Sequence, residues 1–411
     1  MSIYDLNAYE VLQTEDLSDL KSKGTLLKHK KSGARVLLME NDDENKVFTI
    51  GFRTPPSDST GVPHIMEHSV LCGSKEFPVK DPFVELVKGS LNTFLNAMTY
   101  PDKTVYPVAS CNDKDFQNLM HVYMDAVFYP NIYQNDKTFR QEGWSYKLDN
   151  PDGELTISGV VYNEMKGAFS SPEGVLDRVV LNSLFPDNAY SVESGGDPEV
   201  IPELTYEQFL DFHRKYYHPS NSYIYIYGDM DVNERLEYLD REYLSDFDVS
   251  DVDIHANIER QAAFDKPVYE TKPYAITEDE SLEDNTYLSY NAVIGTSVDA
   301  KLYLAFQILD YALVMTPGAP VKQALLDAGI STDVYSSYET SLYQPVYSIV
   351  AKNSNSKEQG RFVSVINDTL EKLVKDGINE RTIEAGINYY EFKYREADYG
   401  PYPKGLMYYL T

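Results

Sequence analysis

The chain has 411 residues, of which 42% are hydrophobic and 13% aromatic, and its 65 acidic and 36 basic residues give a net charge of −29. This length and apolar content are sufficient for two domains with real cores, which excludes a disordered or fibrous protein. The negative charge argues against nucleic acid as a partner, because a phosphate backbone would be repelled; it either favours basic ligands or serves solubility alone.

The cysteines and the N-terminus bear on cellular location. Only two cysteines occur, Cys72 and Cys111, so we expect no disulfide framework and a reducing compartment. The first residues show no basic region followed by an apolar run, and no stretch approaches membrane-spanning length. We therefore expect a cytoplasmic protein with no membrane partner.

The first elements along the chain are two strands, at residues 34–39 and 47–52, on either side of an acidic turn. A short helix is predicted to follow. Ser59 and Thr60 are its candidate N-caps, and Pro63 suits its first turn. Gly73 is expected to end this helical segment.

This short helix carries the most informative residues of the chain. His64, Glu67 and His68 lie at i, i+3 and i+4, so a helix places them on one face. Two imidazoles at this spacing can reach one Zn²⁺ at ~2.0–2.1 Å, and the carboxylate is offset toward the open side of the metal. From there Glu67 can take a proton from a bound water molecule.

Further elements complete the first half of the chain. The pattern predicts helices over 83–95, 114–128, 160–169 and 206–217, strands over 104–108 and 222–227, and a loop-rich region that extends to residue 197.

A charged, proline-containing stretch at 251–284 marks a domain boundary. We predict a catalytic zinc-binding domain over 1–255, a linker over 256–284 and a second, non-catalytic domain over 285–411.

The second domain repeats the element order of the first. Strands are expected at 287–292 and 345–350, and helices at 302–313 and 358–375. This copy contains no histidine, so it cannot supply a second site of the same kind. A last helix is expected to begin after residues 400–403, which leaves the second copy shorter than the first, and we interpret the chain as a fragment.

A catalytic zinc needs a third protein ligand. None of the remaining histidines is a persuasive candidate: His29 lies in a basic run and is expected to be solvated, and the others are His121, His213, His218 and His255. Glu164 stands out as a lone acid in an apolar, helical neighbourhood. From chemistry alone it is equally well explained as an exposed helix glutamate that pairs locally with Lys166 or with nothing.

Several segments together carry a family resemblance. The His64-x-x-Glu67-His68 motif with its continuation over 69–74, and the segments 95–102, 141–144 and 159–167, resemble the inverzincin (M16) metallopeptidases, within them the presequence-protease branch. The resemblance implies an α+β fold of LuxS/MPP-like metallohydrolase rolls, in which an antiparallel sheet is backed by helices, and which is duplicated in this chain.

The resemblance also assigns site residues. It implies that His64, His68 and Glu164 bind a Zn²⁺ and that Glu67 is the general base. It further implies an edge strand on which the main chain of a substrate docks by β-augmentation. The residues of that strand are Asn96, Ala97, Met98 and Thr99.

The expected function is therefore a zinc-dependent endopeptidase that degrades short unfolded peptides, with the C-terminal half of the same enzyme as its second partner. By resemblance, that half supplies an arginine and a tyrosine that hold the substrate carbonyl, so this chain alone should be poorly active. One alternative is a non-catalytic scaffold or peptide-binding subunit, which would be expected to lose a ligand or the base. A LuxS-type lyase with Cys111 as third ligand fits neither the length nor the duplication.

Overall fold

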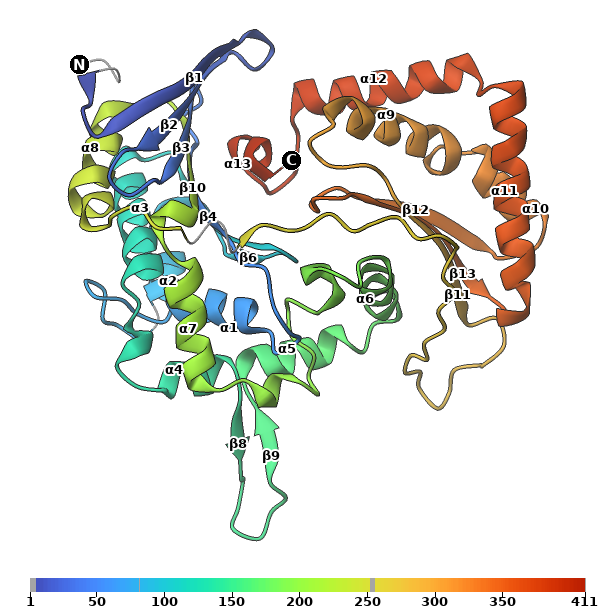
Figure 1. The fold of residues 1–411 in the computed structure, drawn as a ribbon, viewed down its shortest axis with the longest axis horizontal. Coiled ribbons are helices and arrows are strands. Elements are labelled where there is room, and N and C mark those ends of the chain that lie inside the picture. The colour runs from blue at the N-terminus through green and yellow to red at the C-terminus, as the bar shows by residue number, and fades with distance from the viewer. Residues whose placement is uncertain (1–4, 81, 252–255, 411) are drawn as a thin grey trace. The chain divides into compact units, whose positions relative to one another are not determined.

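The computed structural model describes residues 5–80, 82–251 and 256–410, and contacts between them form two compact units (Figure 1). The first unit consists of residues 1–169, 187–259 and 399–411, and the second of residues 170–186 and 260–398. The units interleave along the sequence, because each includes one short segment from the other part of the chain. The domain boundaries expected from the sequence stay a prediction.

The first unit is built on an eight-stranded sheet with the order β1-β2-β3-β10-β4-β7-β5, in which β6 also pairs with β7. Its strands are β1 (Tyr9–Leu17), β2 (Ser22–His29), β3 (Arg35–Glu40), β4 (Lys46–Arg53), β5 (Asn92–Leu95), β6 (Met98–Thr99), β7 (Lys103–Ser110) and β10 (Ser222–Gly228). Neighbouring strands are antiparallel apart from β3 and β10, which are parallel. A sheet backed by helices confirms the α+β fold class.

Side chains that alternate along the strands of this sheet enter two different layers, as the period of two in a strand requires. Phe48 and Ile50 of β4 lie in the main core, which helices of this unit cover. Tyr225 and Tyr227 of β10 lie on the opposite face, where they pack with Leu406.

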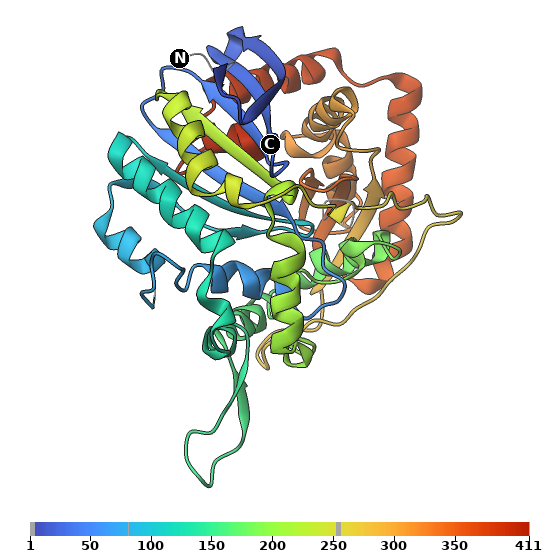
Figure 2. The same ribbon diagram turned by 60° about the vertical axis from the view of Figure 1, so that its left-hand side comes forward.

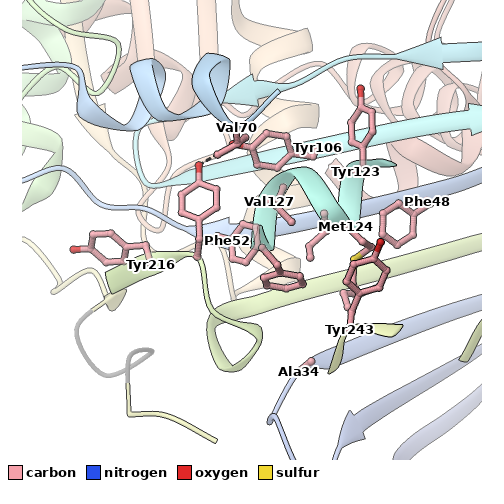
Figure 3. Packing of buried hydrophobic residues seen from close by; sticks show 14 of the residues in the cluster. Ala34, Phe48, Phe52, Val70, Tyr106, Tyr123, Met124, Val127, Tyr216 and Tyr243 are labelled. Carbon is pink, nitrogen blue, oxygen red and sulfur yellow. Dashed lines mark hydrogen bonds between the residues drawn. The ribbon is translucent and has the colours of Figure 1, made fainter. Parts of the chain in front are cut away.

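Eight helices within the described residues belong to the first unit. They are α1 (Val62–Val70), α2 (Pro82–Gly89), α3 (Asp113–Phe128), α4 (Lys137–Glu142), α5 (Val160–Ala168), α7 (Tyr206–Tyr216), α8 (Val232–Glu242) and α13 (Lys404–Leu410). Figure 3 shows Met124 and Val127 of α3 among aromatic side chains of the sheet, which include Phe48 and Phe52 of β4. The hairpin of β8 (Ser145–Lys147) and β9 (Thr156–Ser158) joins α4 to α5 and projects from the rest of this unit (Figures 1 and 2).

The second unit has a three-stranded antiparallel sheet of order β11-β13-β12. Its elements are α6 (Pro172–Leu184), β11 (Thr286–Val293), α9 (Ala300–Asp310), a π-helical turn (Tyr311–Met315), α10 (Pro320–Asp327), β12 (Asp333–Glu339), β13 (Val346–Ser354), α11 (Gln359–Asp376) and α12 (Glu380–Glu396). Phe362 and Ile366 of α11 pack against the sheet. Helix α6 is held here by Glu173, which accepts hydrogen bonds from Lys352 (2.6 Å) and Tyr287 (2.9 Å).

The repeated element order expected from the sequence is found. In the first unit β4 leads to α1, and β7 then leads to α3; in the second, β11 leads to α9, and β13 leads to α11. The strand pairing repeats as well, because β7 lies between β4 and β5 just as β13 lies between β11 and β12.

Three local expectations were wrong. The helix predicted over 83–95 ends at Gly89, and Asn92–Leu95 form β5 instead, because these residues pair with the outer edge of β7. The region expected to be loop-rich contains α6. Neither Ser59 nor Thr60 caps α1, whose N-cap is Gly61 in the left-handed conformation.

Two histidines outside the motif are buried and fully hydrogen-bonded. His29, expected to be solvated, lies 1% exposed between Ser32 (2.7 Å) and Asp240 (3.0 Å), because its strand pairing turns it inward, away from the lysines beside it. His213 donates from Nε2 to the carbonyl of Val127 (2.9 Å) and accepts at Nδ1 from the hydroxyl of Tyr133 (2.7 Å). His255 lies outside the described residues.

One helical run, residues 300–327, is long and apolar enough to cross a membrane by length and composition alone, although we expected no such stretch. It is a weak indication, because a turn divides the run between Met315 and Pro320, with Gly318 at φ +75°. On the C-terminal side of the turn, Val321 and Leu325 are buried in the core of the second unit.

The buried His213 makes the stability of the fold sensitive to acid. Burial lowers its pKa from 6.5 to about 4, so the folded chain favours the neutral ring. The unfolded chain therefore binds more protons between these two pH values, and stability should fall as the pH drops from about 6.5 to about 4, by up to about 3 kcal/mol from this residue.

We expect a His213→Gln variant to lose this part of the pH dependence. Denaturant unfolding of the parent and the variant at several pH values from 7 to 4 measures it directly. If the two curves of unfolding free energy against pH run parallel, His213 does not contribute.

Candidate metal centre

Helix α1 brings His64, Glu67 and His68 together on one face. One ligand atom of each lies within 4.8 Å of the others. The helix begins at Gly61, whose φ of +70° is left-handed, and Pro63 occupies its first turn as expected. The ring centroids of the two histidines are 5.0 Å apart, so their nitrogens can face a shared point.

Glu164 of α5 faces the same point from the other side. Its Oε1 lies 3.6 Å from Nε2 of His64, and its Oε2 lies 3.7 Å from Nε2 of His68. Two atoms that bind one tetrahedral zinc at ~2.1 Å are ~3.4 Å apart, so these separations fit the donor set of such an ion. The side chain of Glu164 is 53% exposed, as the alternative that the sequence left open expects, but the local pair with Lys166 is not among the contacts found.

Glycine residues allow α1, α4 and α5 to pack closely enough to bring these side chains together. A Cβ on Gly159, the N-cap of α5, would lie 2.0 Å from the carbonyl oxygen of Gly143, and a Cβ on Gly143 would lie 3.1 Å from Ile65 of α1. No larger residue fits at Gly159 without moving the backbone. The ends of α4 and α5 are therefore packed against each other and, through Gly143, against the metal-motif helix.

The second ring nitrogen of each histidine also has a partner. Nδ1 of His64 lies 3.0 Å from the carbonyl oxygen of Gly195, and Nδ1 of His68 lies 3.3 Å from Oε2 of Glu142. An acceptor at Nδ1 places the ring proton there and leaves Nε2 free as a ligand atom. Both Nε2 atoms are the ones that face Glu164.

Glu67 is 8% exposed and accepts a hydrogen bond at Oε2 from the hydroxyl of Thr99 (3.0 Å). Burial raises the pKa of Glu67, and the two histidines and Thr99 oppose that rise. A buried carboxylate with a raised pKa is suited to accept a proton.

The contact between His68 and Glu142 shifts both pKa values toward the charged forms. Burial alone would lower the pKa of His68, but the hydrogen bond with Glu142 and the neighbouring carboxylates raise it overall. Burial would raise the pKa of Glu142, yet its hydrogen bonds with His68 and Gln141 hold it below the ordinary value.

A cleft of about 540 Å³ opens onto these residues. Its lining is His64, Glu67, Ala97, Met98, Thr99, Tyr100, Pro101, Glu164, Met165, Glu193, Ser194 and Gly195. Three of the four residues expected to contact substrate thus line the cleft. The fourth, Asn96, is tied into the sheet, because its amide donates to Pro107 (3.2 Å) and its carbonyl accepts from Tyr123 (3.2 Å).

Other candidate ligands lie elsewhere. Cys111 is exposed, just beyond the end of β7, and it is absent from the cleft lining. His121 pairs with Glu76 (3.1 Å) on the surface. Within the described residues, the only group of three or more metal-binding side chains is the one on α1.

No pattern in the sequence assigned a role to Glu142 or to Gly195. Glu142 stands in the segment 141–144 that contributed to the family resemblance, so a signal was present without a function attached to it. Gly195 acts through its backbone carbonyl, which no residue pattern reveals.

Two family descriptions match the chain. Residues 47–151 match the insulinase (peptidase family M16) domain, and residues 203–390 match the peptidase M16 inactive domain. The first match contains the whole α1 motif.

Curated relatives match almost the entire chain. It is 50% identical over 404 residues to "Protein HypA" of Clostridium perfringens, which covers 98% of this chain and 41% of that protein. It is 46% identical over 400 residues to "Presequence protease 1, chloroplastic/mitochondrial" of Arabidopsis thaliana, covering 97% of this chain and 37% of that protein. The chain therefore spans about two fifths of the length of these relatives.

Solved structures share the fold. Pitrilysin superposes with a TM-score of 0.64 at 17% identity, over 96% of this chain and 41% of pitrilysin. A protease from Helicobacter pylori gives 0.64 at 16% identity, over 91% of this chain and 86% of that one. At such identities the likeness concerns the fold alone.

The start of α1 should be intolerant of any side chain. A Cβ on Gly61 would lie 2.7 Å from Cα of Gly196 and 2.8 Å from the carbonyl oxygen of Gly195, which is the partner of His64. Gly400 has a similar φ of +63°, but nothing lies within 4 Å of its Cβ position. The two glycines thus share the backbone strain and differ in the close contact.

We expect Gly400→Ala to cost about 1–2 kcal/mol from strain and Gly61→Ala about 1–3 kcal/mol more from overpacking. Denaturant unfolding of both metal-free variants against the parent measures the difference. If both variants lose the same unfolding free energy, the loop at 195–196 moves to accommodate the new Cβ with no loss of stability.

Proposed function

The chain belongs to peptidase family M16, and on that premise we propose that its first unit is the zinc-binding, catalytic part of a zinc-dependent endopeptidase that degrades short unfolded peptides. One observation carries the proposal: two imidazole Nε2 atoms and the two oxygens of Glu164 converge on one point, and the buried carboxylate of Glu67 lies beside it.

His64, His68 and Glu164 are the proposed zinc ligands. Two imidazoles and one carboxylate are a common donor set for catalytic zinc and leave one position open. Glu67 is the other acid close enough to compete for the metal. Its hydrogen bond with Thr99 and its burial favour a different role.

We assign Glu67 as the general base. When bound, zinc polarises the scissile carbonyl and acidifies a water molecule. Thr99 occupies Oε2 of Glu67, which leaves Oε1 to take the proton from that water and to return it to the leaving amine. The hydroxyl of Thr99 also restricts rotation of the carboxylate, so that Oε1 stays available for this transfer.

The outer edge of the sheet supports a docking role for the substrate backbone. Both β5 and β6 pair with the same side of β7, and the two strands are interrupted at Asn96 and Ala97. An extended peptide that adds to this edge is read mainly through its main chain, so broad sequence specificity follows. Glu67, Glu164 and Glu193 line the cleft, in which there is no lysine or arginine, and this charge favours basic side chains.

The C-terminal half found in longer relatives is the proposed second partner. We expect it to close over the cleft, which would position the peptide and exclude water. A non-catalytic subunit is the alternative, but all four residues that the reaction needs are present. A LuxS-type lyase would need a cysteine ligand, and Cys111 is absent from the cleft.

We expect the purified chain to bind about one zinc, because one complete ligand set is present. His68→Ala and Glu164→Ala should each lower the zinc affinity, while Cys111→Ser should leave it unchanged. Metal analysis and competition with a chelator measure this. Loss of zinc in Cys111→Ser together with retention in Glu164→Ala would support the lyase reading instead.

Glu67→Gln should keep the zinc and lose hydrolysis by about 10²–10⁴-fold, because the amide preserves size but cannot accept the proton. Cleavage of an unfolded peptide is to be measured in the longer protein that includes the C-terminal half, with zinc content as the control. Near-parental cleavage with full zinc content would exclude Glu67 as the base.

A further inference from the structure

Glu142 makes a contact that the proposed mechanism does not use. It is the last residue of α4, it is 6% exposed, and its Oε2 lies 3.3 Å from Nδ1 of His68. Its Oε1 accepts a hydrogen bond from the side-chain amide of Gln141 (2.7 Å). Both carboxylate oxygens therefore have partners, and the group is held inside the protein.

The position of Glu142 rules it out as a ligand of the same ion. It contacts Nδ1 of His68, whereas Nε2 of that ring faces Glu164. The two nitrogens of an imidazole point in different directions, so an acceptor at one nitrogen leaves the other for a metal. Glu142 can act only through His68.

The backbone around Glu142 is arranged to hold it there. Gly143, the next residue, packs against Ile65 one turn before His68 on α1, and its carbonyl oxygen is in contact with Gly159. Close packing of the backbone next to Glu142 therefore restricts where its carboxylate can lie.

The two motif histidines differ in how they are held. His64 uses the backbone carbonyl of Gly195, which is fixed by the chain, and its side chain is 10% exposed. The side chain of His68 is 25% exposed and depends on a side-chain carboxylate. Of the two rings, His68 is therefore the one whose orientation a single substitution can release.

We propose that Glu142 is a positioning residue that holds the proton of His68 at Nδ1 and directs Nε2 to the zinc. This inference rests on the proposed zinc site. A carboxylate that accepts from a metal-bound histidine fixes the ring and makes it a stronger donor, and removal of such a partner usually costs 10–100-fold in metal affinity.

Two substitutions separate the hydrogen bond from packing. Glu142→Met keeps a similar volume but removes the acceptor, and Glu142→Gln keeps an acceptor oxygen for Nδ1. We expect Glu142→Met to weaken Zn²⁺ binding by about 10–100-fold, and Glu142→Gln to restore most of the loss. Competition of the chain with a chelator for Zn²⁺ measures both.

Glu76→Met is the matched control, because Glu76 pairs with His121 by the same kind of contact (3.1 Å) away from the cleft. It should leave the zinc affinity unchanged. Equal losses in Glu76→Met and Glu142→Met would indicate general destabilisation and would overturn the role of Glu142. A Glu142→Gln variant as weak as Glu142→Met would overturn it too.

Nitrogen NMR of the metal-free chain gives a readout that packing would not move. The neutral ring of His68 should carry its proton on Nδ1 in the parent and in Glu142→Gln, and should shift toward the other tautomer in Glu142→Met. An unchanged tautomer in Glu142→Met contradicts the inference. Failure of the parent to bind Zn²⁺ would instead overturn the proposed function, so the two failures can be told apart.

Discussion

The close approach of backbones around α1 is the constraint on which the candidate site depends. Gly61 lies against the loop at 195–196, and Gly143 lies between Ile65 and Gly159. Because a Cβ on Gly61 or on Gly159 would clash with backbone atoms, α1, α5 and the loop at 195–196 are held at separations that only glycine allows. Small changes at these points would move the donor atoms relative to each other, and a metal site tolerates only a few tenths of an ångström.

This packing concentrates negative charge in a small volume. Glu67 and Glu142 are buried, Glu164 contacts both motif histidines, and no lysine or arginine lines the cleft. Isolated buried carboxylates are costly, and they are retained where a partner offsets the cost. A divalent cation held by the imidazoles and Glu164 would be such a partner, which gives the charge pattern a physical reason beyond the solubility of an acidic chain.

The same unit joins the proposed base to the proposed docking edge. Thr99 belongs to β6, which pairs with the outer edge of β7 as β5 does, and its hydroxyl donates a hydrogen bond to Glu67. A peptide strand added at this edge would therefore lie next to the residue that handles the proton. The interruption at Asn96 and Ala97 lies between β5 and β6, where the edge is already irregular and the carbonyl of Asn96 is tied down by Tyr123.

Local patterns in the sequence determined most elements of the fold and the face of α1 that carries the motif, because periods of 2 and 3.6 and the i, i+4 spacing act over a few residues. They also determined the repeated element order. They could not show that 92–95 form a strand, that His29 is buried or that Glu142 reaches His68. Each of these depends on a partner outside the few residues that a local pattern spans, namely β7, Asp240 and α1, and only tertiary packing decides which segments meet.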